Sequence, residues 1–556
     1  MTNKEIARAF RELGDLMELH GENTFKIRSY QNAYLTLRKL ETPLSEMSAK
    51  DLDDIKGVGS AIAGKIRELL QVGKIQLLEK YKAVTPPGVV EMMDIDGFGP
   101  KKVFTVWKDL GVESVGELLY AVNENRLIEL KGFGKKTQDA LQQKLEYYQR
   151  SKDKFHYATL EAEAIDIIKY LQKKLPSAVI SGTGALRRCA NVVDGIEIII
   201  AIESDINSIF DNKILTLKNK EEDIITALTE NTYPVTIYTC KPSEFGSTLF
   251  QTTAAPDFLA AFNKQFSNID INNLPNEQAV FTKLNLSYIE PELRESGDIL
   301  QKAIQNQLPK LVEEKDIIGV LHTHTTYSDG LHTLHEMVAY AHKRGYAYIG
   351  ITDHSKAAFY ANGLQVERLL QQWAEIDTLN KELAPFRIFK GIESDILNDG
   401  SLDYEESILK QFDFIIASVH SNLRMDKEKA TRRLITAIEN PYTTILGHPT
   451  GRLLLSREGY SIDHQQVIDA CAANGVAIEL NANPYRLDLD WTWIPYALEK
   501  GVKIAINPDA HSREGIHDIH YGTLSARKGG LTAAMCVNHL SVEAFASFIQ
   551  QKKSNS

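Results

Sequence analysis

The chain has 556 residues, 43% of them apolar and 25% charged, which is the composition of a globular protein with room for several domains. Its four scattered cysteines show no CxxC spacing, so neither a disulfide framework nor a thiolate zinc site is indicated. The first residues open an amphipathic helix, and no apolar stretch approaches about 20 residues. We therefore expect a cytoplasmic protein without a membrane segment.

The net charge of −11 is spread unevenly along the chain. Residues 1–150 are almost neutral, with 23 Lys and Arg against 22 Asp and Glu. A DNA-binding domain usually carries a distinct excess of positive charge. If this region binds DNA, local backbone geometry must therefore contribute beyond bulk charge.

Three Gly-x-Gly loops, at residues 55–59, 95–102 and 130–136, each follow a helical stretch and open another. In a helix-hairpin-helix, two glycines let the backbone approach a phosphate closely, and the N–H groups at the helix N-terminus bind its oxygen. A single loop of this kind is most often an ordinary turn, but three copies predict binding to the DNA backbone that is independent of base sequence. The candidate DNA-binding residues are Gly57, Gly59, Gly97, Gly99, Lys101, Lys102, Gly132, Gly134, Lys135 and Lys136.

From residue 317 onward, short apolar segments alternate with helical ones such as 334–343 and 366–379. This pattern predicts repeated βα units with a parallel sheet or barrel, in which function sits at the C-terminal ends of the strands. The expected strands are residues 317–321, 348–352, 387–392, 412–419, 442–447, 476–480 and 502–506.

Each of these seven segments runs into a loop that carries His, Asp, Glu or Asn. The first leads into His322-Thr-His324, where an extended chain would point both histidines the same way, and a turn then returns Asp329 toward them. Histidines outside these loops are expected to be ordinary buried or solvated residues. The loop residues that follow the other six segments are Asp353, His354, Glu393, His420, His448, Asn481, Asn483, Asp509 and His511.

Imidazole and carboxylate ligands without thiolate favour Mn, Zn or Fe over copper or iron-sulfur centres. Nine of these twelve loop residues are potential metal ligands, which is more than one ion needs, so two or three ions bridged by carboxylates fit better. Such clusters activate water and stabilise the leaving oxygen of a phosphate ester. Hydrolysis of a phosphoester is therefore the reaction class that these residues favour.

The segments HTHTTYSDG, TDH, GIES, SVH, GHP and NPDAH resemble the motifs of the polymerase-and-histidinol-phosphatase (PHP) domain. The resemblance implies a distorted seven-stranded βα barrel with a trinuclear site. It also implies that Asp353 and Asn483 lie beside the metal ligands and that Arg452 contacts a substrate phosphate. For each of these three residues, a helix cap or a surface ion pair is at least as good an interpretation. The metal ligands that the resemblance implies are His322, His324, Asp329, His354, Glu393, His420, His448, Asp509 and His511.

The N-terminal loops and the preceding Asn23-Thr-Phe-Lys-Ile-Arg28-Ser-Tyr30 resemble the N-terminal region of family X DNA polymerases. The resemblance implies recognition of gaps or nicks. In that family a lysine after the first hairpin can form a Schiff base with a deoxyribose phosphate, and Lys65 stands at the matching position. A solvated helix lysine is the alternative interpretation of Lys65.

Residues 155–305 resemble the palm and thumb of the same polymerases but lack their metal ligands. Where the family has three aspartates that bind two Mg²⁺ ions, this chain has Gly195, Glu197 and Thr236. Asp194 could replace the first aspartate only by a register shift, which would turn its side chain to the opposite face of the strand. Because two-metal phosphoryl transfer depends on these carboxylates, we predict a degenerate polymerase core without useful nucleotide incorporation.

The whole chain thus resembles a bacterial, polymerase-beta-like family X DNA polymerase with a C-terminal PHP domain. We expect a multidomain α and α/β protein: a helix-hairpin-helix region at 1–150, an α+β palm and thumb at 151–305, a linker at 306–316 and the PHP barrel at 317–556. The resemblance implies a metal-dependent 3′-to-5′ exonuclease, with AP endonuclease or 3′-phosphatase activity also open. We expect gapped, nicked or 3′-ended DNA and repair proteins as partners of a monomer that joins the nucleoid when bound to DNA.

Three other functions stay open at this stage. A small-molecule phosphatase of the histidinol-phosphate type would explain the barrel but not the regions before it. An active gap-filling polymerase would explain the domain order but needs its aspartates. A non-enzymatic DNA-binding scaffold would carry an empty or merely structural metal site.

Overall fold

The computed structural model describes residues 1, 3–38, 40, 42–95, 97–128, 130, 132–150, 154–210 and 213–554. The chain divides into two compact units, Met1–Gln149 and Arg150–Ser556. In the described residues, no helix is both long and apolar enough to cross a membrane.

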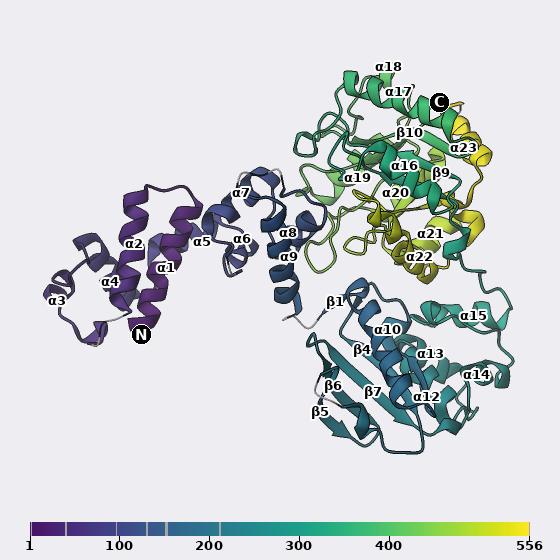
Figure 1. The fold of residues 1–556 in the computed structure, drawn as a ribbon, viewed down its shortest axis with the longest axis horizontal. Coiled ribbons are helices and arrows are strands. Elements are labelled where there is room, and N and C mark those ends of the chain that lie inside the picture. The colour runs from purple at the N-terminus through teal and green to yellow at the C-terminus, as the bar shows by residue number, and fades with distance from the viewer. Residues whose placement is uncertain are drawn as a thin grey trace. The chain divides into compact units, whose positions relative to one another are not determined.

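The first unit is helical throughout its described residues (Figure 1). Helices α1 (Asn3–Leu19) and α2 (Thr24–Leu37) pack together, and the rings of Phe10 and Tyr30 stack with centroids 6.0 Å apart. The side chain of Asn23 begins α2 by accepting a hydrogen bond from the backbone N–H of Phe25. The other helices are η1 (Leu44–Glu46), α3 (Ala49–Asp53), α4 (Ser60–Val72), α5 (Gln76–Val84), α6 (Pro87–Met92), α7 (Pro100–Leu110), α8 (Val115–Asn123) and α9 (Lys135–Arg150).

The second unit begins with an α+β region around a five-stranded sheet of order β2-β4-β7-β6-β5. The central pair, β4 (Ile196–Ala201) and β7 (Pro234–Cys240), is parallel, and the other pairs are antiparallel. Isoleucines dominate β4 because a β-branched side chain packs well on a buried pleated surface. The remaining strands are β1 (Phe155–His156), β2 (Val179–Gly182), β3 (Val192–Val193), β5 (Leu215–Glu221) and β6 (Ile224–Thr229).

Helices α10 and α12 contact this sheet, at β2 and at β4 respectively (Figure 1). A cluster of phenylalanines, among them Phe250, Phe258 and Phe262, forms a separate core between the helices that follow β7. The helices of the region are α10 (Tyr157–Lys174), α11 (Gly184–Arg187), η2 (Asn207–Ile209), η3 (Pro242–Glu244), α12 (Phe245–Thr253), α13 (Pro256–Gln265), α14 (Glu277–Lys283), η4 (Pro291–Leu293) and α15 (Asp298–Ile304).

The rest of the second unit is a seven-stranded parallel sheet in sequential order from β8 to β14. A bridge between Thr323 and Ala510 brings its two edges together, so the sheet is a nearly closed barrel, as the sequence predicts. The strands read as short apolar runs because both faces of a parallel sheet are buried. They are β8 (Gly319–Thr323), β9 (Tyr348–Ile351), β10 (Arg387–Asp395), β11 (Phe414–Ser418), β12 (Ile445–Leu446), β13 (Ala477–Asn481) and β14 (Ile504–Asn507).

One end of the barrel is filled by apolar side chains. Phe545 of α23 (Val542–Ser554) stacks on Tyr348 with ring centroids 5.4 Å apart and contacts Phe389 and Phe414. The opposite, C-terminal ends of the strands carry the polar loops. The helices around the barrel are η5 (Glu314–Asp316), α16 (Leu334–Lys343), η6 (Phe359–Ala361), α17 (Val366–Glu382), α18 (Glu406–Leu409), α19 (Lys427–Glu439), α20 (His464–Asn474), η7 (Trp491–Trp493), α21 (Ile494–Glu499), η8 (Glu514–Asp518), α22 (Ile519–Lys528), η9 (Ala533–Met535) and η10 (Val537–His539).

Candidate metal centre and nucleic-acid interface

The barrel brings all nine predicted ligand side chains together at the C-terminal ends of its strands. Eight of them form three overlapping groups in which the potential ligand atoms lie within 4.8 Å of one another. The ninth, His448, has its Nε2 3.0 Å from Oε1 of Glu393. The three groups are His324, Asp329, His354 and His511; His322, His324 and Asp509; and His354, Glu393 and His420.

The two histidines at the end of β8, His322 within the strand and His324 just after it, converge in a way that the sequence did not predict. His322 adopts a left-handed backbone conformation, with φ of 59°, at a bulge between Val320 and Thr323. The rings of His322 and His324 face the same cluster, with centroids 5.3 Å apart, but the simple alternation of an extended chain is not the cause. A left-handed non-glycine residue costs roughly 1–2 kcal/mol, and Asp509 is also left-handed, so two of the candidate ligands lie on strained backbone.

Several buried atoms of the cluster approach one another without forming hydrogen bonds. Among the described residues, Nε2 of His322, Nδ1 of His354 and Oε2 of Glu393 have no hydrogen-bond partner. Yet Nδ1 of His354 lies 2.9 Å from Oε2 of Glu393, and Nε2 of His322 lies 3.3 Å from Oε1 of the same carboxylate. Buried polar atoms normally have hydrogen-bond partners. Here the lone pairs of these nitrogen and oxygen atoms point toward one another instead, which is the arrangement expected of ligands for divalent cations.

Charge in the cluster is distributed as a cation site requires. Burial, together with the neighbouring His511 and His354 rings, lowers the pKa of His324 to about 4, so this imidazole is neutral at pH 7 and can act as a ligand. Burial alone would lower the pKa of His420, but Glu393 and Asp395 raise it to about 10. The histidines around Glu393 hold the pKa of its carboxyl well below the usual range despite its burial.

Two carboxylates that sequence reasoning missed orient ligand histidines. Glu479, on β13, lies 2.7 Å from Nδ1 of His322, and Asp395, at the end of β10, lies 2.5 Å from Nδ1 of His420. A carboxylate on the far nitrogen fixes the tautomer and the orientation of a metal-binding histidine. An acidic residue inside an otherwise apolar strand was the signal for Glu479.

The residues that the resemblance placed near the metals have different surroundings. Asp353 is fully buried and accepts hydrogen bonds from Thr325, Ser328 and Gln372, so it holds the loop that carries His324. Oδ1 of Asn483 accepts a hydrogen bond from the backbone N–H of Tyr485 and thereby closes a turn.

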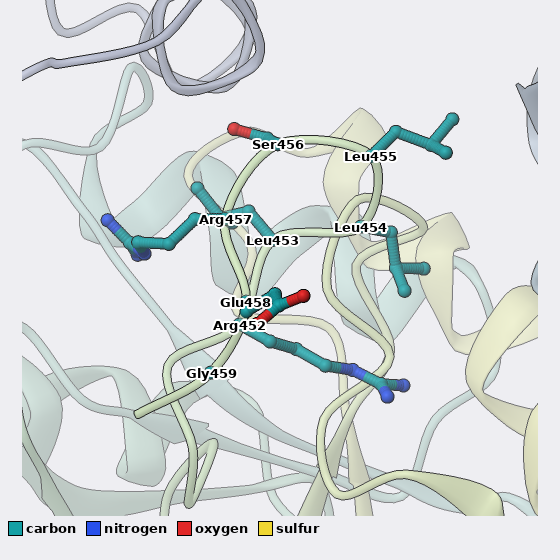
Figure 2. Close-up of a pocket in the computed structure, with 8 residues that line it drawn as sticks. All are labelled: Arg452, Leu453, Leu454, Leu455, Ser456, Arg457, Glu458 and Gly459. Atoms are coloured by element: carbon teal, nitrogen blue, oxygen red, sulfur yellow. The ribbon is translucent and has the colours of Figure 1, made fainter. Parts of the chain in front are cut away.

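Arg452 belongs to the loop that follows His448. Its guanidinium pairs with Asp490 and donates to the backbone carbonyls of Arg486 and Leu487, so it links two loops. Residues Arg452 to Gly459 line a cavity of about 490 Å³ beside this loop (Figure 2). Arg452 therefore stabilises the rim of the barrel and has few donors left for a substrate phosphate.

The three hairpin loops of the first unit share one backbone geometry. The first glycine of each loop has a positive φ, 88° at Gly57, 76° at Gly97 and 90° at Gly132. Only glycine adopts this conformation readily. The repeated Gly-x-Gly pattern therefore forms three equivalent turns, although Asp96 and Lys131 within them lie outside the described residues.

The second glycine of each loop, Gly59, Gly99 or Gly134, begins the next helix. A Cβ added at any of the three would meet no described atom within 4 Å, so the helix N-terminus is open to an approaching phosphate. Lys101, Lys135 and Lys136 are exposed beside these termini, whereas Lys102 donates to the carbonyl of Gly97.

Lys65, the candidate Schiff-base residue, lies on α4 with its side chain 28% exposed. Its ammonium is 2.6 Å from Oε2 of Glu68, and Oε1 of that carboxylate accepts the backbone N–H of Gln76. Lys65 is therefore paired with a neighbouring carboxylate on its own helix, and its role as a Schiff-base residue stays a prediction.

The polymerase-like region places its degenerate positions on two adjacent strands. Glu197 on β4 pairs in register with Thr236 on β7, and Gly195 immediately precedes β4. Oε2 of Glu197 accepts a hydrogen bond from the backbone N–H of Ala185. Asp194 is exposed and lies 3.3 Å from Lys154. Within the described residues, groups of histidine and acidic side chains that could share a metal ion occur only in the barrel and not on this sheet.

Comparison with known proteins follows the same division of the chain. Residues 1–75 match the family model of a helix-hairpin-helix domain, residues 89–146 that of a SAM-like helix-hairpin-helix tandem, and residues 321–483 that of the PHP domain. The fold and the site therefore define a DNA-binding protein with a PHP-type metal centre.

Whole-chain similarity identifies the family. The chain is 33% identical over 572 aligned residues to the DNA polymerase/3′-5′ exonuclease PolX of Bacillus subtilis (strain 168), covering 99% of this chain and 100% of that protein. The chain belongs to the PolX family, and the resemblance to bacterial family X polymerases is confirmed. A probable phosphatase of Thermoanaerobacter sp. (strain X514) is 29% identical over 245 residues, covering 42% of this chain and 94% of that protein.

Proposed function

We propose that the chain is a DNA-processing nuclease whose PHP domain hydrolyses phosphodiester bonds in the 3′-to-5′ direction. One observation carries the proposal: nine buried or partly buried His, Asp and Glu side chains converge at the polar end of the barrel. Such a cluster suits the hydrolysis of phosphate esters. The helix-hairpin-helix loops of the same chain favour DNA as the source of the ester.

The nine side chains would hold two or three divalent ions, with Mn²⁺ and Zn²⁺ the best candidates and Fe also compatible. When bound, the ions lower the pKa of water and offset the charge of the phosphate. The residues of the chain fix the geometry of the site: Glu479 and Asp395 orient two histidines, and the carboxylate of Glu393 lies within 3.3 Å of the rings of His322 and His420.

We also propose that the polymerase-like region does not incorporate nucleotides. Of the three metal-binding positions only Glu197 is acidic, and it already binds the backbone of Ala185. Arg187 is held by Glu277 at 2.7 and 2.8 Å and by Thr253 at 2.7 Å, so it is not available to a nucleotide triphosphate. The region then serves as a DNA clamp or spacer.

The domain limits stay a proposal: hairpin region 1–150, polymerase-like region 151–305, linker 306–316 and PHP barrel 317–556. The protein would act as a monomer in the cytoplasm, on gapped, nicked or 3′-ended DNA at the nucleoid, together with repair proteins. The relatives named as probable phosphatases support a second candidate, removal of a terminal phosphate. AP endonuclease activity would use the same centre.

The test is an incubation of purified protein with Mn²⁺ and a gapped duplex whose primer is labelled at its 5′ end, with and without dNTPs. A His324→Ala variant is the control. We expect the primer to shorten with wild-type protein only, and no extension with dNTPs. Extension would refute the degenerate polymerase core, and no shortening together with hydrolysis of small phosphate monoesters would favour the second candidate.

A further inference from the structure

Exposed apolar side chains of the barrel gather around the metal centre. In the described part of residues 317–556, five large apolar side chains are exposed: Leu331, Phe359, Tyr360, Leu370 and Leu455. Four of them lie on loops that follow the ligand-bearing strands β8, β9 and β12, and Leu370 lies on α17. Single exposed apolar residues are normal on a protein surface, but four at the end that carries the metal ligands point to a substrate.

The aromatic pair Phe359 and Tyr360 is the most prominent part of this rim. Phe359 is 83% exposed and Tyr360 42% exposed. The Tyr360 ring is edge-on to the ring of His354, a candidate metal ligand, with centroids 6.1 Å apart. Phe359 directly precedes Tyr360, so its exposed ring belongs to the same loop as this contact with a candidate metal ligand.

The loop that presents Phe359 is anchored at both ends. The backbone N–H of Leu364 donates to the carbonyl of His354, and the N–H of Ala357 donates to Asp403 at 2.6 Å. Gly363 packs so closely that a Cβ there would lie 1.9 Å from the carbonyl oxygen of Ser355. The exposure of Phe359 is therefore built into a fixed loop, which keeps the entropy cost of binding low.

Cationic side chains stand on the same set of loops. Lys356 precedes the aromatic pair. Arg457, on the loop after β12, also donates to the carbonyl of Gly451, and Arg513, on the loop after β14, lies 3.8 Å from Glu514. Figure 2 shows Leu455 at the tip of its loop, with Arg457 projecting from the same loop. Aromatic platforms combined with cations are the means by which proteins bind single-stranded nucleic acid, through base stacking and phosphate contacts.

We propose that Phe359 is a stacking platform for the terminal base of an unpaired 3′ strand whose last phosphodiester lies at the metal centre. The proposal rests on the proposed nuclease function and specifies which side chain holds the terminal base. A paired terminal base is stacked within the duplex and must leave it to reach Phe359. Phe359 is therefore a specificity-determining residue for the base at the 3′ end.

The first test measures stacking without turnover. Metal-loaded full-length protein is mixed with an oligonucleotide that has 2-aminopurine as its 3′-terminal base and a phosphorothioate as its last linkage. We expect wild-type protein and Phe359→Trp to quench the fluorescence, and Phe359→Ala to lose the quenching. Leu370→Ala, which removes another exposed apolar side chain away from the rim, should quench like the wild type. Quenching that is absent or insensitive to Phe359→Ala overturns the proposal.

The second test uses the reaction itself. Loss of one base stack should slow removal of a base-bearing nucleotide from an unpaired 3′ tail by about tenfold in Phe359→Ala. Removal of an abasic terminal residue should proceed at the wild-type rate. Equal effects on both ends would overturn the stacking role while leaving the nuclease function intact. Phe359-dependent quenching without hydrolysis by any variant would instead refute the nuclease function alone.

Discussion

Glu479 and His322 form a buried pair at the centre of the barrel, with a carboxylate oxygen 2.7 Å from Nδ1 of the imidazole. The other ring nitrogen, Nε2, is thereby directed to Glu393 and Asp509, each at 3.3 Å. Both residues of the pair are completely buried. The carboxylate therefore sets which nitrogen of His322 is offered to a metal ion.

Replacing Glu479 with Gln should weaken metal binding by about 10- to 100-fold, because the ring of His322 loses the group that orients it. Metal content after dialysis, measured by mass spectrometry, and titration with Mn²⁺ would check this. The exposed Glu499→Gln is the matched control and should bind metal as the wild type does. Unchanged metal affinity in Glu479→Gln would show that the pair has no orienting role.

Metal binding should release protons near neutral pH. The pKa of His420 is raised to about 10, and that of His322 is raised well above its usual range by Asp509, Glu479 and Glu393 despite its burial. Both rings are therefore protonated at pH 7 and must lose a proton to bind a cation. Calorimetric titration in buffers of different ionisation enthalpy measures the number released. The release from His420 should decline above about pH 10, and no dependence on buffer at pH 7 would contradict this assignment.

Stability of the polymerase-like region should depend on Glu277, which is buried between Arg187 and Arg294. Burial alone would raise its pKa, but hydrogen bonds from the two arginines lower it to about 2. A depressed carboxyl pKa stabilises the fold above the unfolded value of 4.5, and the effect is lost as the pH falls toward 2. The difference corresponds to about 3 kcal/mol.

Glu277→Gln should therefore lower the unfolding temperature of this region at pH 7, since it leaves two buried arginines without a carboxylate, at a cost of roughly 3–5 kcal/mol. Wild type and variant should become more alike as the pH falls below about 4. Scanning calorimetry across that range makes the comparison. The control is Glu203→Gln at an exposed position, and this variant should unfold like the wild type at every pH. If Glu277→Gln has an equally small effect, the ion pairs of Glu277 with Arg187 and Arg294 do not stabilise the region.

The second glycine of each hairpin loop should contribute to DNA affinity without being needed for folding. Gly99 has an ordinary negative φ and open space at its Cβ position, so Gly99→Ala adds only a methyl group where a phosphate would approach. We expect about fivefold weaker binding to a gapped duplex, the loss of roughly one hydrogen bond. Fluorescence anisotropy at several salt concentrations measures it. Gly64→Ala is the control, because a Cβ at Gly64 within α4 also meets open space. Equal DNA affinity of the two variants would exclude the hairpin contact.

Local sequence determined most of the architecture and the identity of the candidate ligands. The βα repeats, the seven strands and the loops after them follow from apolar periodicity, which depends on residues close together in the chain. The Gly-x-Gly turns could also be predicted from the sequence, because the positive φ of their first residue requires glycine. Ligand chemistry resides in the side chains themselves, so His, Asp and Glu after successive strands predicted a metal centre.

Tertiary structure decided the relationships between distant residues. Glu479 reaches His322 across 157 positions of sequence, and Glu277 reaches Arg187 across 90, so no local pattern marks either pair. The left-handed turn at His322 likewise depends on barrel closure, where Ala510 donates to the His322 carbonyl. The sequence also could not show that the guanidinium of Arg452, a candidate phosphate contact, pairs with Asp490 on another loop. Such contacts exist only in the folded chain, because burial and hydrogen bonding between distant segments, not local propensity, determine their energy.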